Sequence, residues 1–448
     1  MPETVYIVHS IDTEGPLYEP ITATFERLKS IFNIELEATE ENLLAIQKKQ
    51  INLGGKEQDV AEVFSPHNIT YYDSWQKIDA MLEEVTSAHF RNLLPDSFGD
   101  GWIFNWHCLD LVGFKDNPRR RELGYGKVFE HYKNLVDRSN PKSKDALHFH
   151  YHPVPFSKAA NVCATHFFSN SNSLFEILSR RIIDHNWFPA AFRAGFHCER
   201  PDSHWFLEQY VPFDFSSQAV DDSKLANQRD LAAGRYGDWR QAPRNWQPYH
   251  PDHDDYQKPG NCRRWITRCL NMPGSRLRML EQPHVDQAFE EAGSGKPTIL
   301  AFTNHDFRDM RSEIDATREM IRSAASRFPK VKFKYCEAKE AMRLALQLKP
   351  TPPCKLRFEF EGNRLFIRSD MKPFGPQPFL ALKTKAGEYH HDNLDFQESG
   401  HLWSYTLDGQ TFHLNQIERI GVGTCDAYGN STTLVMDLAT RETKLTHN

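Results

Sequence analysis

The sequence of 448 residues contains no run of 18 apolar residues, so no transmembrane helix is expected. It also lacks the basic segment and the uninterrupted apolar core of a signal peptide, because Asp12 and Glu14 interrupt the first apolar run. The eight cysteines are scattered and form no Cys-x-x-Cys pair. Without an export signal, they are expected to be the reduced thiols of a cytoplasmic protein.

The sequence also has no excess of positive charge: it contains 54 Lys and Arg against 60 Asp and Glu, and the formal net charge is −6. This balance argues against general nucleic-acid binding, which requires a basic surface. The sequence shows no internal repeat and no low-complexity tract. What remains is the composition of an ordinary globular protein, 39% hydrophobic and 25% charged, with length enough for two or three domains.

Strand-like and helix-like segments alternate along most of the chain. Apolar and β-branched or aromatic runs predict strands at residues 5–11, 101–111, 145–153, 188–195, 297–306 and 331–336. Helical spacing and capping residues predict helices within residues 22–50, 74–94, 171–185, 310–327 and 337–347. This alternation is typical of an α/β sheet or barrel, with functional groups at the C-terminal ends of parallel strands.

The pattern changes after the proline-rich segment 349–354. Short alternating segments separated by Gly, Asp-Gly and Gly-Asn turns then predict an all-β module, most simply a sandwich. The expected division is a barrel domain at 1–348, with an insertion at about 16–145 and a polar flap at about 220–262, followed by a β-sandwich-like domain at 352–448.

Polar side chains mark the ends of four expected strands. They are Asp12 and Glu14 on the first, His148, His150 and His152 on another, Arg193 on a third and His305 on a fourth. Acids are costly at the end of a core strand unless they bind a partner. Carboxylate and imidazole together are a ligand set for one divalent ion, zinc being the expected ion.

The three histidines lie within five residues, and Pro153 disfavours helical geometry at His152. An extended chain places His148, His150 and His152 on one face. Residues four apart on a straight strand are about 13 Å apart, at roughly 3.3 Å per residue. Either the chain bends after His148 or His150 is a ligand. A histidine-rich strand edge without any metal is the simpler alternative.

In their order along the chain, these residues resemble the five motifs of the NodB-like polysaccharide deacetylases, carbohydrate esterase family 4. The stretches that carry the resemblance are Ser10 to Gly15, His148 with His152-Pro153, "FRAGF" with Arg193, "PFDFSS" with Asp214, and "ILAFTNHD" with His305. The resemblance spans about residues 4 to 345. It implies a deformed (β/α) barrel and a metal-dependent deacetylase.

The resemblance also implies roles for the residues. Asp12 matches the family's general base, Arg193 the arginine that pairs with it, and His305 the histidine acid. Glu14, His148 and His152 match the metal ligands, while His150 is the alternate that the strand spacing allows. The closest likeness is to a subgroup with Asp-x-Glu in the first motif, associated with bacterial polysaccharide gene clusters.

The chain departs from the family pattern in four ways. Glu14 replaces an aspartate and lies one residue further along, and Ala194-Gly195 interrupts the third motif, which usually contains proline. The insertion at about 16–145 is unusually long, and the β module is additional. Departures within the motifs favour the alternative of a catalytically silent barrel.

Other residues are candidates for substrate binding. Trp106 and His107 end a strand, Asp214 lies in the fourth motif, and Trp246 and Tyr249 lie in an aromatic, arginine-rich stretch at 235–257. That stretch could hold a sugar, or a nucleotide or lipid diphosphate through arginine pairing. Core packing of the aromatic residues and a solvated loop are the alternatives.

The function expected from this reasoning is metal-dependent deacylation of an N-acylated sugar or glycan intermediate in bacterial surface polysaccharide biosynthesis, of O-antigen, lipopolysaccharide or capsule. The sugar could be free, nucleotide-linked or lipid-linked. One alternative is a catalytically silent barrel that binds glycan or a partner in the assembly pathway. Another is an amidohydrolase acting on a small non-sugar amide. The sequence does not specify the oligomeric state.

Overall fold

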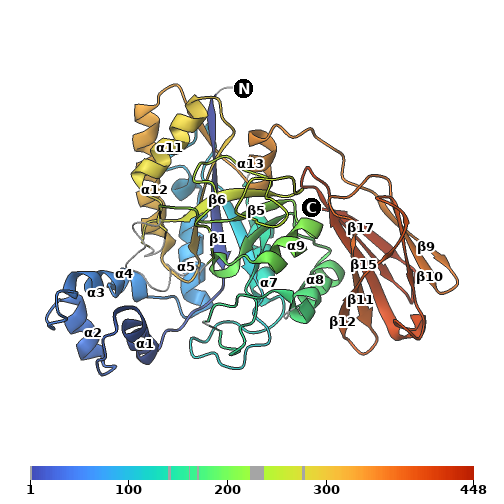
Figure 1. The fold of residues 1–448 in the computed structure, drawn as a ribbon, viewed down its shortest axis with the longest axis horizontal. Coiled ribbons are helices and arrows are strands. Elements are labelled where there is room, and N and C mark those ends of the chain that lie inside the picture. The colour runs from blue at the N-terminus through green and yellow to red at the C-terminus, as the bar shows by residue number, and fades with distance from the viewer. Residues whose placement is uncertain (1–2, 140–142, 161, 169–170, 222–236, 275–277) are drawn as a thin grey trace.

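The computed structural model describes residues 3–139, 143–160, 162–168, 171–221, 237–274 and 278–448. Within these residues, seven parallel strands pair in sequence order, and β7 pairs back onto β1 to close a barrel (Figure 1). They are β1 (Thr4–Thr13), β2 (Phe104–Leu109), β3 (Ala146–Tyr151), β4 (Ala191–Ala194), β5 (Phe213–Ser217), β6 (Trp265–Asn271) and β7 (Thr298–His305). The predicted α/β barrel is confirmed.

Strand β1 organises the barrel because both of its edges are paired. Its second half, from His9, pairs with β2, while its first half pairs on the same edge with β8 (Lys332–Tyr335). Its other edge pairs with β7, and this register sets Asp12 opposite His305. All ten of its residues are buried. The strand therefore delivers its terminal polar residues into the interior.

Helices cover the outside of the barrel (Figure 1). They are α5 (Trp75–Val85), α6 (Ala88–Arg91), α7 (Lys127–Arg138), α8 (Ser171–His185), α9 (Pro201–Tyr210), α11 (Gln282–Gly293), α12 (Met310–Arg327) and α13 (Ala338–Ala345). Helix α12 is one example of how the local sequence determines a helix. The Asp309 side chain caps it by accepting from the N–H of Arg311, and Ile314 and Ile321, one heptad apart, face the barrel.

The long insertion between β1 and β2 begins as a small helical lobe, at the lower left in Figure 1. It contains α1 (Ile21–Phe32), α2 (Glu40–Gln47), α3 (Glu57–Val63) and α4 (Pro66–Ile69). Phe25, Ile46 and Phe64 belong to a separate apolar core of the lobe. The helical region expected at 22–50 consists of two helices: the first ends where Asn33 adopts a left-handed conformation, and the second is capped by Thr39.

The C-terminal region is built from antiparallel sheets, as the alternating pattern predicts. One sheet has the order β13-β14-β10-β9 and the other the order β12-β11-β15-β16-β17. The strands are β9 (Leu356–Glu361), β10 (Arg364–Ser369), β11 (Phe379–Thr384), β12 (Tyr389–Asp392), β13 (Asp395–Glu398), β14 (Leu402–Thr406), β15 (Ile417–Cys425), β16 (Ser431–Asp437) and β17 (Thr443–His447). Apolar residues from both sheets form one shared core.

The five-stranded sheet of this module packs against α8 and the neighbouring barrel surface (Figure 1). The rings of Phe188 and Phe379 are in contact, tilted by 45° with their centroids 6.0 Å apart, and belong to the same apolar cluster as the barrel core. Gly421 and Gly423 on β15 let α8 and the segment after it approach closely, since a Cβ at Gly421 would lie 2.7 Å from Ile182 and one at Gly423 2.5 Å from the Phe188 ring. The two parts therefore share a tightly packed interface.

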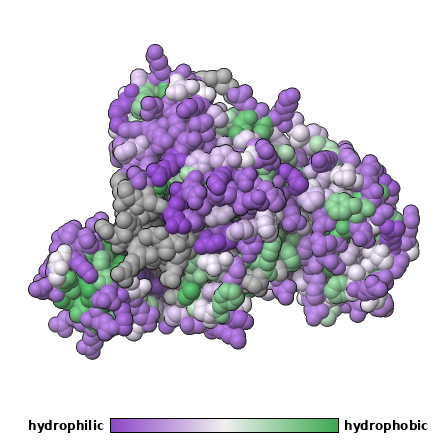
Figure 2. Space-filling model, in the orientation of Figure 1, coloured by the Kyte–Doolittle hydropathy of each residue, from purple (hydrophilic) through white to green (hydrophobic). Residues whose placement is uncertain are grey.

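Residues 222–236 of the expected flap lie outside the described residues; the rest, from 237 to 262, is largely irregular and carries only isolated β-bridges. None of the described helices is long and apolar enough to cross a membrane. The face shown in Figure 2 is predominantly hydrophilic, with scattered hydrophobic residues on the helical lobe and on the C-terminal module.

Candidate metal centre

The C-terminal ends of the barrel strands bring the predicted polar residues together. Asp12 and Glu14 end β1, His150 and the following His152 end β3, and His305 ends β7. All except His305 are at most 5% exposed, and His305 is partly open to a cavity. Ionisable groups buried without partners are costly, so their convergence requires a compensating arrangement.

Glu14, His150 and His152 form a compact buried group. His152 Nε2 lies 3.2 Å from Glu14 Oε1 and 3.1 Å from His150 Nε2. The third side, from His150 Nε2 to Glu14 Oε1, measures 3.8 Å. These three ligand atoms lie within 4.8 Å of one another and could hold a metal ion. One carboxylate and two imidazoles are a ligand set found in catalytic zinc sites.

The two histidines are set in the state that binds metal. Nδ1 of His150 lies 2.8 Å from the Arg193 carbonyl oxygen, which fixes Nδ1 as the donor and leaves Nε2 as the free lone pair. Burial lowers the pKa of His150 and holds the pKa of His152 well below its usual value. Both rings are therefore neutral, as coordination requires.

A second carboxylate, Asp306, positions the Glu14 loop. It accepts the N–H of Glu14 at 2.9 Å and the N–H of Gly15 at 3.0 Å. Tyr132 donates its hydroxyl to the same carboxylate at 2.8 Å. Gly15 has φ +71°, a left-handed conformation that favours glycine and turns the chain here. Asp306 directly follows His305 in the sequence, and that adjacency is the signal that could have identified it.

Asp12 has a different partner from Glu14. Arg193 Nε donates to Asp12 Oδ1 at 2.6 Å, and the same guanidinium donates to the Phe215 carbonyl at 2.9 Å. Burial alone would raise the pKa of Asp12, but the charge of the Arg193 guanidinium and its hydrogen bond outweigh the effect of burial and hold the pKa below its usual value. Asp12 is therefore ionised at neutral pH.

His305 lies within reach of both acids. Its Nε2 is 3.8 Å from Asp12 Oδ2 and 3.9 Å from Glu14 Oε1. Burial holds the pKa of His305 well below its usual value. The ring is therefore neutral at rest and can both accept and donate a proton.

His148 lies apart from this group, although the family resemblance assigns it as a ligand together with Glu14 and His152. Its Nε2 is 3.0 Å from Asn105 Oδ1 and 3.4 Å from Glu337 Oε1. Strand β3 stays extended through Tyr151, so His148 lies deeper in the barrel. The structure thus brings the alternate ligand, His150, into the cluster in its place.

Two of the predicted substrate-binding residues lie in the barrel wall. Trp106 is fully buried, with ring-centroid distances of 5.3 Å to Phe104 and 4.9 Å to Tyr132. His107 is fully buried against His148, 4.9 Å between ring centroids. Neither contributes to the cavity beside the metal group.

The other three also serve packing in the structure. Asp214 is buried in an ion pair with Arg264 and accepts the N–H of Ser216. Trp246 is fully buried and donates its indole N–H to the His284 carbonyl at 2.8 Å, and the buried Tyr249 hydroxyl donates to the Tyr256 carbonyl at 2.9 Å. None of the three lines the cavity in the described part of the chain.

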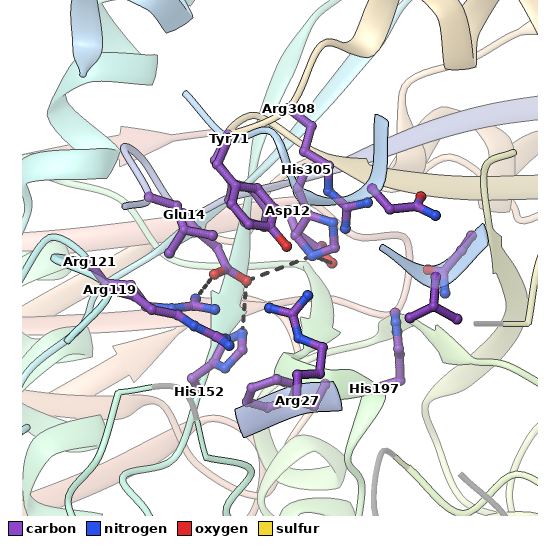
Figure 3. A pocket seen from close by; sticks show the side chains of 16 residues that line it. Asp12, Glu14, Arg27, Tyr71, Arg119, Arg121, His152, His197, His305 and Arg308 are labelled. Carbon is purple, nitrogen blue, oxygen red and sulfur yellow. Dashed lines mark ion pairs between the residues drawn. The ribbon is translucent and has the colours of Figure 1, made fainter. Parts of the chain in front are cut away.

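The cavity has a volume of about 200 Å³ and opens beside Asp12, Glu14, His152 and His305 (Figure 3). Its other walls come from residues that the sequence interpretation did not include. They are Leu17, Arg27, Val63, Asn68, Tyr71, Arg119, Arg121, Phe196, His197, Asn271, Phe307 and Arg308. In the sequence, only the run of three arginines at 119–121 could have indicated this part of the cavity lining. The other residues are brought to the cavity by the tertiary structure and have no distinctive local sequence.

Arg121 touches the metal group directly, because its guanidinium forms an ion pair with Glu14 (Figure 3). Oε1 of Glu14 faces the two histidines, while Oε2 is the oxygen paired with Arg121. The arginine can therefore orient the carboxylate without occupying the oxygen that faces the histidines.

Comparison of the chain with protein-family models, with curated proteins and with solved structures finds no match.

Proposed function

We propose that this protein is a metal-dependent hydrolase that removes the N-acyl group from an amino sugar or glycan intermediate, in the manner of the NodB-like deacetylases. One observation carries the proposal: the Glu14–His150–His152 group lies beside an ionised, arginine-paired Asp12 and a partly exposed His305. A ligand set, a base and a proton relay around one cavity are the parts that amide hydrolysis requires.

The residues present fit a divalent ion, held by Glu14, His150 and His152. When bound, such an ion polarises an acyl carbonyl and lowers the pKa of water. Asp12 lies outside the ligand group because Arg193 holds its Oδ1. The two acids of the first motif therefore have separate tasks.

Asp12 takes a proton from the attacking water, whose oxygen forms a bond to the acyl carbon. The bond between that carbon and the nitrogen then breaks, and the amine leaves with a proton delivered by His305. His305 Nε2 lies 3.8 Å from Asp12 Oδ2, so the two groups must close to hydrogen-bond distance on substrate binding before the proton passes from the acid to the ring. Arg193 keeps Asp12 ionised before the attack and holds its Oδ1 in place, so that Oδ2 is the oxygen that accepts the proton.

The cavity volume supports a small reacting group. About 200 Å³ is below the roughly 300–1,000 Å³ typical of pockets for drug-sized ligands. A single sugar residue, free or at the end of a longer carrier, matches this size. The resemblance to deacetylases of polysaccharide gene clusters favours an intermediate of bacterial surface polysaccharide, O-antigen or capsule. The small volume equally suits the alternative of a small non-sugar amide.

The test combines metal analysis with product detection. The purified protein should bind about one divalent ion per chain and release acetate or formate from at least one N-acyl sugar. Release from simple amides but from no sugar would favour the amidohydrolase alternative. A stably bound ion with no hydrolysis of any substrate would favour a silent binding barrel, and absence of metal binding would contradict the proposal.

A further inference from the structure

One wall of the cavity is strongly cationic. Arg27, Arg119, Arg121 and Arg308 line it, together with Tyr71 (Figure 3). The carboxylates on the lining are Asp12 and Glu14 alone among the described residues. Both already have arginine partners, Arg193 and Arg121. The remaining arginines therefore exceed what the site's own acids can balance.

Two of these arginines share one acid behind the cavity wall. Glu19, with a side chain only 3% exposed, pairs with Arg119 at 3.1 Å and also with Arg27. Their side chains are 16% and 20% exposed, so both are mostly desolvated. One carboxylate holding two guanidinium groups fixes their positions and leaves a net positive charge facing the cavity.

Arg308 adds a further positive charge to the cavity lining, on the side where Tyr71 and His305 lie (Figure 3). Its guanidinium carbon lies 5.7 Å from the Phe307 ring centroid and 5.9 Å from that of Tyr71. Its Nε is buried and has no hydrogen-bond partner among the described residues. The Glu313 carboxylate interacts with it electrostatically and itself accepts from the Asn304 side chain at 2.9 Å. A buried donor without a partner is costly, so the charge of Arg308 is incompletely compensated by the described residues around it.

Backbone hydrogen bonds join the segments that carry the wall. Leu17 N–H donates to the Tyr72 carbonyl at 2.9 Å, and Tyr18 N–H donates to the Arg119 carbonyl at 2.8 Å. Tyr72 N–H donates to the Phe307 carbonyl at 2.7 Å. The cationic wall is thus assembled in advance, although its parts come from the helical lobe, the loop after β2 and the loop after β7.

We infer that the cavity recognises its substrate through an oxyanion, a phosphate or a carboxylate, carried close to the N-acyl group. The inference rests on the proposed function and narrows its substrate class to acidic sugars, sugar phosphates or nucleotide-linked sugars. Guanidinium groups pair with both kinds of oxyanion through two parallel N–H donors. The ligand's charge would offset the excess of arginine in the cavity lining.

The test compares four N-acetylhexosamines: neutral, 1-phosphate, nucleoside-diphosphate and 6-carboxylate. At least one anionic form should exceed the neutral form in kcat/KM by about 10-fold or more, the scale of a charge-assisted hydrogen bond. A preference for the two phosphorylated forms would identify phosphate as the source, and a preference for the uronate would identify carboxylate. Equal kcat/KM for the neutral and all anionic sugars would overturn the inference.

Variants test the wall itself. Arg308→Gln and Arg119→Gln should each lower kcat/KM for the preferred anionic sugar about 10- to 100-fold and change it for the neutral sugar less than about 3-fold. Arg308→Lys keeps the charge but loses the paired N–H donors of the guanidinium, so its kcat/KM for the anionic sugar should lie between those of the unaltered protein and Arg308→Gln. Arg322→Gln, on the exposed side of α12, is the control. Equal losses on neutral and anionic sugars would mean a merely structural role and reject the inference.

Direct binding separates this inference from the proposed function. Calorimetry with the 1-phosphate and 6-carboxylate sugars measures affinity without turnover. Tighter binding than the neutral sugar, lost in Arg308→Gln, would support the anion site even if no amide is hydrolysed. Turnover of sugars with no such difference in binding would retain the hydrolase and reject the anion site.

Discussion

Two regions of the molecule bury opposite kinds of side chain: the C-terminal end of the barrel, called the open end below, and the barrel face that packs on the C-terminal module. The open end encloses ionisable groups such as Asp12, Glu14 and His150. The interface with the module encloses rings and aliphatic chains, with Phe188 and Phe379 packed beside glycines of β15. Apolar packing stabilises a fold, whereas buried charges contribute little net stability and are often retained for function.

This contrast predicts that the two regions fail differently when altered. Substitutions at the open end should change metal affinity or turnover more than the free energy of unfolding. Substitutions at the module interface should lower the free energy of unfolding while metal binding stays intact. Each of the following changes tests one side of that difference.

The largest effect is expected at Asp12. Asp12→Asn removes the base while keeping the size of the side chain, so turnover should fall about 10²- to 10⁴-fold with the metal content unchanged. Glu14→Gln should instead lower metal affinity and turnover together, because it removes a charged ligand. Metal content by elemental analysis and acyl release are measured side by side. An Asp12→Asn protein with normal turnover would disprove the base assignment.

The second test uses two histidines from the same strand. His150→Ala removes a ligand, and the affinity for the divalent ion should fall by at least the roughly 10- to 100-fold typical of changes to the groups supporting a ligand. His148→Ala should retain the metal and lose about 1–3 kcal/mol of stability, because it opens a cavity at a buried ring and removes the hydrogen bond between His148 Nε2 and Asn105 Oδ1. Metal titration and urea unfolding of both variants give the comparison. The reverse result would restore His148 as the ligand.

The choice between these histidines shows what a sequence can determine. Extended geometry puts His148, His150 and His152 on one face of a strand, and that much follows from alternation alone. Which of them meet Glu14 depends on where β3 leaves the barrel and on the partners Asn105 and Glu337, which lie far away in the chain. Strand spacing therefore limited the histidine ligands to His152 with either His148 or His150, and it could not decide between those two.

The sequence predicted the architecture but not the lining of the cavity. The alternation of strands and helices predicted the α/β barrel, and Gly-rich turns predicted the antiparallel sheets. The tryptophan and tyrosine of the 235–257 stretch, Trp246 and Tyr249, suggested sugar binding, yet they pack inside the protein. Arg27 and Arg308 reach the cavity from a helical insertion and from a loop, and nothing in their local sequence distinguishes them from surface arginines.

The third test concerns pH at the module interface. His391 stacks on Phe379 at 3.9 Å, and burial lowers its pKa to about 4 from an ordinary value of 6.5. The unfolded chain therefore binds a proton before the folded one does, so the free energy of unfolding should fall as pH drops from 6.5 towards 4. The loss should reach about 2–3 kcal/mol near pH 4.5 and be absent above pH 7.

The variant that isolates this effect is His391→Asn, which can keep a donor for the Leu380 carbonyl and does not titrate. Urea unfolding at pH 7.5 and 5 should show a smaller pH dependence in the variant than in the unaltered protein. His253→Asn is the control, because its ring is 77% exposed. Identical pH dependence in all three proteins would mean that the interface does not exclude the charged form of His391.

The smallest effect is expected from one added methyl group. Gly423→Ala would place a Cβ 2.5 Å from the Phe188 ring and 2.9 Å from Ile182. Neither the helix nor the sheet can move freely, so overpacking should cost about 1–3 kcal/mol. Gly409→Ala, whose Cβ would meet only His413 at 3.6 Å, should change the free energy of unfolding by less than about 0.5 kcal/mol. Both variants should bind metal as the unaltered protein does, because the interface holds none of the ligands. A loss of metal affinity confined to Gly423→Ala would show that packing on the module also sets the geometry of the open end, and the two regions would then have to be treated as one coupled unit.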